Sequence, residues 1–174
     1  MNDATRAYIK KVADAVRSTF DAAIPIDNID SLVQDLGGRI VEQPGLDQLY
    51  DGTIRKVGEH SFEIAIFPYQ CDEIRNFAIA HELGHLFLHM GYLVSKGTWD
   101  QQSDGHQFTR FGANEQEQQA NEFAAALLMP QKEFQEKIEE YSSGNFVNMA
   151  QVANYFHVSI SAATNHGRLL RYLQ

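Results

Sequence analysis

The sequence has little cysteine and little positive charge. Its 174 residues include one cysteine, Cys71, so no disulfide can form within the chain, and a reducing compartment fits best. Lys and Arg number 14 against 23 Asp and Glu, which gives a formal net charge of -9. Because binding along a phosphate backbone depends on Lys and Arg, this balance argues against broad nucleic-acid binding, although it leaves room for a local basic patch.

Long apolar runs are missing as well. Residues 1–20 contain no uninterrupted apolar core of the kind that a signal peptide or a membrane span requires. We therefore expect a cytoplasmic protein that does not use a membrane. With 44% hydrophobic residues and no internal repeat, the chain suits one domain with a real core, or one domain with a small appendage.

Helical periodicity dominates the sequence. Apolar residues at spacings of three and four predict helices at 4–21, 27–36, 72–90, 115–129, 131–141, 149–156 and 161–173. Short runs rich in β-branched and alternating residues predict strands at 39–42, 52–57 and 61–67, and we expect them to form a small antiparallel sheet. The polar stretch 91–114 is expected to be a long surface loop. The predicted fold is α+β and mainly helical.

One predicted helix carries an unusual set of polar residues on an apolar background. Phe77–Met90 reads FAIAHELGHLFLHM. His81 and His85 are four residues apart, so on a helix they point in directions about 40° apart and can bind one metal ion. Glu82 lies about 100° round from His81, which in an HExxH motif lets it take a proton from the water on the metal. The motif predicts a metal site with a general base.

Two further residues of this helix need an explanation. His89 continues the histidine face by another turn, but a zinc ion with four protein ligands has no open position for water. We therefore assign His89 a supporting or packing role behind the ligands. Gly84 is expected to cost about 1 kcal/mol relative to alanine in a helix, which predicts a close approach at this position, such as that of a sheet strand.

Two histidines leave a hydrolytic zinc site one protein ligand short. The acidic helix from residue 115 is the expected source, and Glu115, Glu117 and Glu122 point in different directions, so only one can face the site. Asn121 lies one turn beyond Glu117 on the same face and can orient a ligand histidine. This spacing favours Glu117, with Glu115 and Glu122 as the competing ligands.

Two motifs carry a family resemblance. The segments RNFAIAHELGHLFLH at 75–89 and ExxAN-x-FAAALLMP at 117–130 resemble the ImmA/IrrE family of metallopeptidases. Weaker similarity extends to PIDNIDSLVQDLGGRIV at 25–41 and VANYFHVS at 152–159. The resemblance implies a zincin-like metallopeptidase fold.

The resemblance also implies domains, ligands and chemistry. Residues 1–143 would form the zincin-like metallopeptidase domain, and 144–174 a helix-turn-helix-like segment packed on it. His81, His85 and Glu117 would bind Zn²⁺, although such ligands also accept Mn²⁺ or another divalent ion. Glu82 would be the general base of peptide hydrolysis, with Asn121 and His89 supporting the ligands. The implied substrate is a regulatory protein, a helix-turn-helix repressor of a phage, mobile element or stress response.

The oxyanion of the tetrahedral intermediate also requires a donor. The sequence offers four candidates and does not choose among them: Tyr50, Tyr92, His106 and Arg110.

A competing function is a non-catalytic regulator that keeps the zincin scaffold and binds a partner protein or DNA. Glu82 argues against it, because a protein that only binds does not need a general base. The tail contains Arg168 and Arg171, which is thin support for phosphate contacts. We therefore do not expect direct DNA binding.

Overall fold

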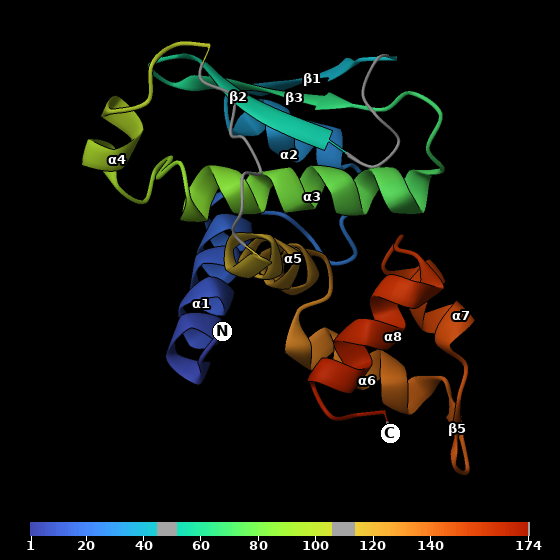
Figure 1. The fold of residues 1–174 in the computed structure, drawn as a ribbon. Helices are drawn as coiled ribbons and strands as arrows, with labels where there is room; N and C mark the ends of the chain where they lie inside the picture. The colour runs from blue at the N-terminus through green and yellow to red at the C-terminus, as the bar shows by residue number, and fades with distance from the viewer. Residues whose placement is uncertain (45–51, 106–113, 174) are drawn as a thin grey trace.

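A computed structural model describes residues 1–44, 52–105 and 114–173. A three-stranded sheet lies on one side of the long helix α3 (Asp72–Leu88), and the helices α1 and α5 lie on the other (Figure 1). The strands are β1 (Gly38–Glu42), β2 (Gly52–Gly58) and β3 (Ser61–Ile66). Helix α3 is therefore buried between two layers, and residues 78–87 are all buried.

The sheet has the order β1-β3-β2, with β3 in the centre. β2 and β3 are antiparallel, as the sequence predicts, and a turn at residues 59–60 joins them. β1 is parallel to β3, with Gly38 opposite Phe62 and Glu42 opposite Ile66, so the sheet is mixed. β2, at the far edge of the sheet, runs in the direction opposite to β1, and the turn after β2 reverses the chain again. β3, which lies between them, therefore runs parallel to β1.

The predicted helices are present, with ends that differ by a few residues. The N-terminal part contains α1 (Asp3–Thr19) and α2 (Ile29–Asp35), followed after α3 by α5 (Asn114–Leu128) and α6 (Gln131–Glu140). Asn2 and Asn28 begin α1 and α2, and each side chain accepts a hydrogen bond from a backbone N–H three residues on. The apolar faces that the periodicity predicts are buried, as in α1.

The expectation of a plain surface loop after α3 is wrong for its described part. A short helix, α4 (Lys96–Asp100), forms there, and the Trp99 side chain is 4% exposed. The indole Nε1–H donates to the Glu59 carbonyl at 2.6 Å, and Lys56 Nζ lies 4.8 Å from the ring centre. The segment is thus anchored to the β2–β3 hairpin by a buried aromatic residue, which polar composition alone does not predict. The rest of the predicted loop, 106–113, lies outside the described residues.

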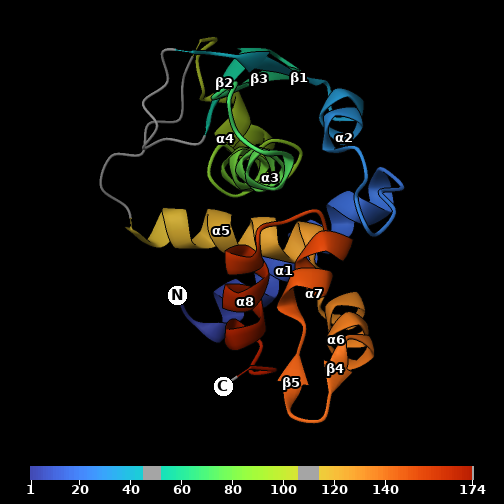
Figure 2. The ribbon, with the colours of Figure 1, turned by 90° about the vertical axis from the view of Figure 1, so that its right-hand side faces the viewer.

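Helix α5 crosses α3 on the side away from the sheet (Figure 2). At the crossing, a Cβ atom added to Gly84 would lie 2.9 Å from Ala120 Cα and 3.0 Å from the Ala120 carbonyl oxygen. The close approach that the sequence predicts at Gly84 therefore exists, but the partner is a helix and not a sheet strand. Glycine on α3 and alanine on α5 bring the two backbones together.

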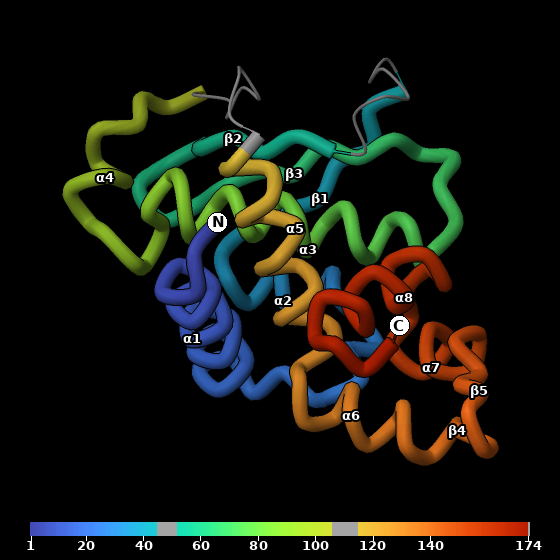
Figure 3. The backbone as a smooth tube through the Cα atoms, turned by 60° about the horizontal axis from the view of Figure 1, so that its bottom comes forward, coloured from blue at the N-terminus to red at the C-terminus, as the bar shows by residue number. Residues whose placement is uncertain are grey.

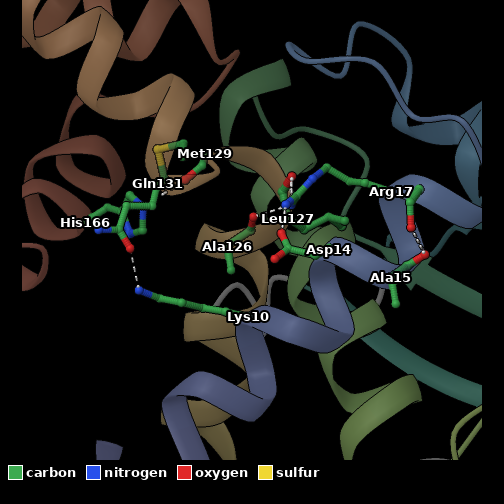
Figure 4. Close-up of polar contacts among 10 residues, drawn as sticks. Lys10, Asp14, Ala15, Arg17, Ala126, Leu127, Met129, Gln131 and His166 are labelled. Carbon is green, nitrogen blue, oxygen red and sulfur yellow. Dashed lines mark hydrogen bonds and ion pairs between the residues drawn. The ribbon is translucent and has the colours of Figure 1, made fainter.

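The C-terminal end of α5 is held by α1 (Figure 4). The Arg17 guanidinium donates from Nη1 to the carbonyl oxygens of Ala126 and Leu127, and it also pairs with Asp14. These carbonyls belong to the last turn of α5, where backbone acceptors have no partner within the helix and a cation interacts favourably with the helix dipole. Arg17 therefore fixes one end of the helix whose other end contains Glu117.

The C-terminal segment forms a group of its own in the views of Figures 1 and 3. After α6 come the short strands β4 (Ser142–Ser143) and β5 (Phe146–Val147), then α7 (Met149–Tyr155) and α8 (Ile160–Leu169). The Phe134 ring of α6 stacks on Phe156 at 5.8 Å and meets the edge of His166 at 4.8 Å. The segment therefore packs on α6, while the domain boundary at 143 stays a prediction. Across the described ranges, no helix has both the length and the apolarity that crossing a membrane requires.

Candidate metal centre

Three side chains from two helices converge at the crossing of α3 and α5. His81 Nε2 and His85 Nε2 are 3.0 Å apart. The Glu117 carboxylate, from the first turns of α5, places Oε2 3.2 Å from His81 Nε2 and Oε1 3.3 Å from His85 Nε2. One ligand atom from each residue lies within 4.8 Å of the others, so the three can hold one metal ion.

The spacing of these atoms fits a small divalent ion. Ligand bonds of about 2.0–2.1 Å in a tetrahedral arrangement separate the ligand atoms by about 3.3 Å. The two Nε2 atoms, at 3.0 Å, and the nearer carboxylate oxygen of Glu117 to each of them, at 3.2 and 3.3 Å, have separations close to this value. Two imidazoles and one carboxylate also leave a coordination position for water or substrate, which is the pattern of a hydrolytic site and not of a structural one.

The ligand atoms lie at the edge of the core. His85 is fully buried and His81 is 8% exposed, whereas the Glu117 side chain keeps 31% of its surface exposed. The centre is therefore rigidly held on the α3 side and open to solvent on the α5 side. This openness is what a site acting on a large substrate requires.

The two competing carboxylates lie elsewhere. Glu115 is exposed, and Glu122 is buried on another face of α5, where its Oε1 lies 3.3 Å from Arg6 Nε. Burial raises the pKa of Glu122, and the positive charges of Arg6 and Lys10 oppose that rise. Of the three acidic residues that the sequence leaves open, the structure brings only Glu117 to the two histidines.

The second nitrogen of each histidine ligand also has a partner. His81 Nδ1 lies 2.9 Å from Asn121 Oδ1, and His85 Nδ1 lies 2.9 Å from His89 Nδ1. His89 Nε2 in turn lies 3.1 Å from Gln119 Oε1. Burial lowers the pKa of His89, so its neutral form is favoured. The sequence gives no signal for Gln119, because the ExxAN motif leaves the residue type at this position unspecified.

Glu82 is 2% exposed and lies against the beginning of β2. A Cβ atom added to Gly52 would lie 3.1 Å from Glu82 Cγ and 3.3 Å from Glu82 Oε1. The missing side chain at residue 52 thus leaves room for the carboxylate beside the sheet. The sequence did not predict this role of Gly52. Its only signal is that a glycine stands at the start of a predicted strand.

Tyr92 does not face the metal centre. Its hydroxyl donates to the Leu36 carbonyl at 2.7 Å and lies 3.1 Å from the His60 carbonyl, and the residue is 4% exposed. Gly91, with a φ of 80°, reverses the chain after α3 and directs Tyr92 into the core under the sheet. The interpretation of Tyr92 as a candidate oxyanion donor is therefore wrong. The other three candidates, Tyr50, His106 and Arg110, lie outside the described residues.

Comparisons with known proteins agree with this geometry. The profile of the peptidase M78 family, described as the IrrE N-terminal-like domain, matches residues 48–166. No curated protein matches the chain. A solved structure titled Mycobacterium tuberculosis transcriptional regulator is similar in fold, with a TM-score of 0.56 and 19% identity. The alignment covers 90% of this chain and 45% of that chain, so this chain spans less than half the length of the regulator.

The matched span includes all three convergent ligands and both motifs that the sequence singles out. It covers well over half of the 174 residues. The chain therefore belongs to the family of IrrE N-terminal-like peptidases.

Proposed function

We propose that this protein is a zinc-dependent endopeptidase that cleaves a regulatory protein. The observation that carries the proposal is the convergence of His81, His85 and Glu117, which fits a divalent ion with an open coordination position. A structural zinc site would use a closed set of four ligands. The exposure of Glu117 supports the same conclusion, since a protein substrate must reach the site from solvent.

In this proposal His81, His85 and Glu117 hold the metal and Glu82 moves the proton. A bound divalent ion supplies Lewis acidity, which polarises the scissile carbonyl and lowers the pKa of water to about 7. The Glu82 carboxylate takes a proton from the attacking water as its oxygen bonds to the carbonyl carbon. Glu82 then delivers that proton to the amine nitrogen as the C–N bond breaks, which returns the carboxylate to its starting state.

The partners behind the ligands fix the tautomer of each histidine. For His81 and His85 to bind through Nε2, each must carry its proton on Nδ1. His81 then donates from Nδ1 to Asn121 Oδ1, and His85 donates from Nδ1 to His89 Nδ1. His89 can accept that bond because its own proton is on Nε2, which donates to Gln119 Oε1. Asn121, His89 and Gln119 thereby orient the two ligand rings.

The proposed substrate is a transcriptional repressor with a helix-turn-helix, and the proposed compartment is the cytoplasm. Family resemblance supports the substrate, and the single cysteine, which is exposed, suits a reducing compartment. The division of the chain into a metallopeptidase domain of residues 1–143 and a tail of residues 144–174 belongs to the same proposal.

Incubation with helix-turn-helix repressors from the same genome, beginning with any encoded by a neighbouring gene, tests the proposal directly. The wild type loaded with Zn²⁺ should cleave one of them, and Glu82→Gln should lower the rate by about 10²- to 10⁴-fold while the metal content stays at one ion per chain. Glu115→Gln, which changes an exposed carboxylate of α5, is the matched control and should cleave like the wild type.

Equal cleavage by wild type and Glu82→Gln would rule the mechanism out. Tight binding of a repressor without any cleavage by metal-loaded wild type would instead favour the non-catalytic regulator. The same reactions with Mn²⁺ in place of Zn²⁺ compare the two ions that the ligands can accept.

A further inference from the structure

A large cleft opens beside the metal centre. It has a volume of about 700 Å³ and lies between α3, α5 and α8, with the beginning of α1 at its rim. Its walls include side chains from each of these helices: Ile74 and Phe77, Asn121 and Ala125, Ala162 and Leu169. The volume is in the range of sites that bind a small molecule or part of a peptide.

The cleft borders the candidate metal centre through Asn121, the partner of His81 Nδ1. Asn121 lines the cleft and its Oδ1 lies 2.9 Å from the ring of His81. On α3, Phe77 lies one helical turn before His81 and on the same face. On α5, Gln118 also lines the cleft and directly follows Glu117. Because the lining begins one helical turn from His81 and one residue from Glu117, the residues of a polypeptide next to a scissile bond at the metal ligands can extend toward the cleft.

The cleft presents large apolar side chains next to polar ones. Ile74 and Leu169 keep 42% and 41% of their surfaces exposed, so both can still bury apolar area against a bound side chain. Its charged side chains are Arg6 and Glu122, and Arg6 Nε lies 3.3 Å from Glu122 Oε1, so they pair with each other. The cleft thus offers dispersion contacts and apolar burial, and its two charged side chains are paired with each other.

The length of the cleft limits where the bound residue can lie. Along α5 the lining runs from Gln118 to Ala125, which is about 10 Å at 1.5 Å per residue. An extended peptide advances about 3.3 Å per residue, so about three substrate residues span this distance. Amide and hydroxyl groups of Asn165 and Ser161 line the same cleft and suit the peptide backbone.

We propose that this cleft binds a large apolar side chain of the protein substrate, on one side of the scissile bond and within about three residues of it. The inference rests on the proposed peptidase function and adds the substrate's chemistry to it. It makes the cleft a determinant of specificity, and Leu169 a residue that sets which side chain is accepted.

A synthetic library of randomised decapeptides tests the inference with two readouts. In the first, Zn²⁺-loaded wild type and Leu169→Glu digest the library and mass spectrometry maps the cut sites. We expect the wild type to favour Leu, Ile, Phe or Met at one position within three residues of the cut. Leu169→Glu should lower kcat/KM for those peptides by about tenfold or more, mainly through KM, and favour Lys or Arg at that position.

In the second readout, immobilised Glu82→Gln protein retains peptides from the same library, and adding Leu169→Glu to it should abolish the enrichment for apolar residues. The matched control is Phe146→Glu, at an apolar residue that is 82% exposed and far from the cleft lining, and it should change neither profile. Metal content and melting temperature verify that each variant is folded.

The two readouts separate the two proposals. Retention of apolar peptides without cleavage by the wild type would overturn the peptidase function and leave the cleft as a binding site. Cleavage without positional preference for apolar residues, or profiles that Leu169→Glu leaves unchanged, would overturn the assignment of the cleft. Neither cleavage nor retention would overturn both.

Discussion

Substitution of Gly84 by alanine should separate α3 from α5 and weaken metal binding. The new Cβ atom would lie 2.9 Å from Ala120 Cα, whereas ordinary van der Waals contact begins at 3.4 Å, so the helices must move apart by about 0.5 Å. Overpacking of this kind costs about 1–3 kcal/mol, and the better helix propensity of alanine returns about 1 kcal/mol. We expect a net loss of about 0–2 kcal/mol in the free energy of unfolding.

The effect on the metal should exceed the effect on stability. His81 and His85 are on one helix and Glu117 is on the other, so a shift of about 0.5 Å changes the separations of 3.2 and 3.3 Å directly. Metal sites tolerate deviations of about 0.2 Å in their ligand distances. We therefore expect the metal affinity of Gly84→Ala to fall by about tenfold or more.

Urea unfolding of the metal-free protein and competitive titration with a zinc chelator measure the two quantities separately. Gly97→Ala in α4 is the matched control, because no atom lies within 4 Å of the added Cβ, and it should leave metal affinity unchanged. Adding Ala120→Gly to Gly84→Ala should restore little, since the closest contacts are with the Cα atom and the carbonyl oxygen of residue 120. Metal affinity within twofold of wild type in Gly84→Ala would refute this account of the helix crossing.

Two further predictions concern pH. Burial lowers the pKa of His166 to about 4, so between about pH 6.5 and 4 the unfolded chain binds a proton that the folded protein does not. The free energy of unfolding should fall by about 2 kcal/mol from pH 7 to pH 5 through this residue, and in His166→Gln that contribution should disappear. Urea unfolding at both pH values measures it. If the free energy of unfolding depends on pH equally in wild type and His166→Gln, the prediction is contradicted. Burial tends to raise the pKa of Glu63, but hydrogen bonds from Arg39 at 2.8 Å and Arg55 at 2.7 Å outweigh it and lower the pKa. Glu63→Gln should therefore lose about 1–3 kcal/mol in the free energy of unfolding at pH 7. The difference from wild type should shrink as the pH falls below about 4, because the Glu63 carboxylate becomes protonated. A difference that stays constant in thermal melts down to pH 3 would exclude this ion-pair explanation.

The sequence by itself determined most of the elements and the chemistry of α3. The longer helices and the three strands of the main sheet each show their period in a short window, so their boundaries could be predicted to within a few residues, whereas α4 and the two-residue strands β4 and β5 were not predicted. The HExxH spacing likewise depends only on the geometry of a single helix, in which residues four apart share a face. Family membership followed from the two motifs for the same reason, since both are local strings.

The tertiary structure decided whatever depends on two elements meeting. It brought Glu117 to the histidines, paired Glu122 with Arg6, directed Tyr92 into the core, and gave α5, not a strand, as the neighbour of Gly84. It also brought α8 to face α3 and α5, and so formed the cleft. Periodicity fixes the direction of a side chain about its own helix, but the distance between side chains on different helices depends on where the helices cross and how closely their backbones pack.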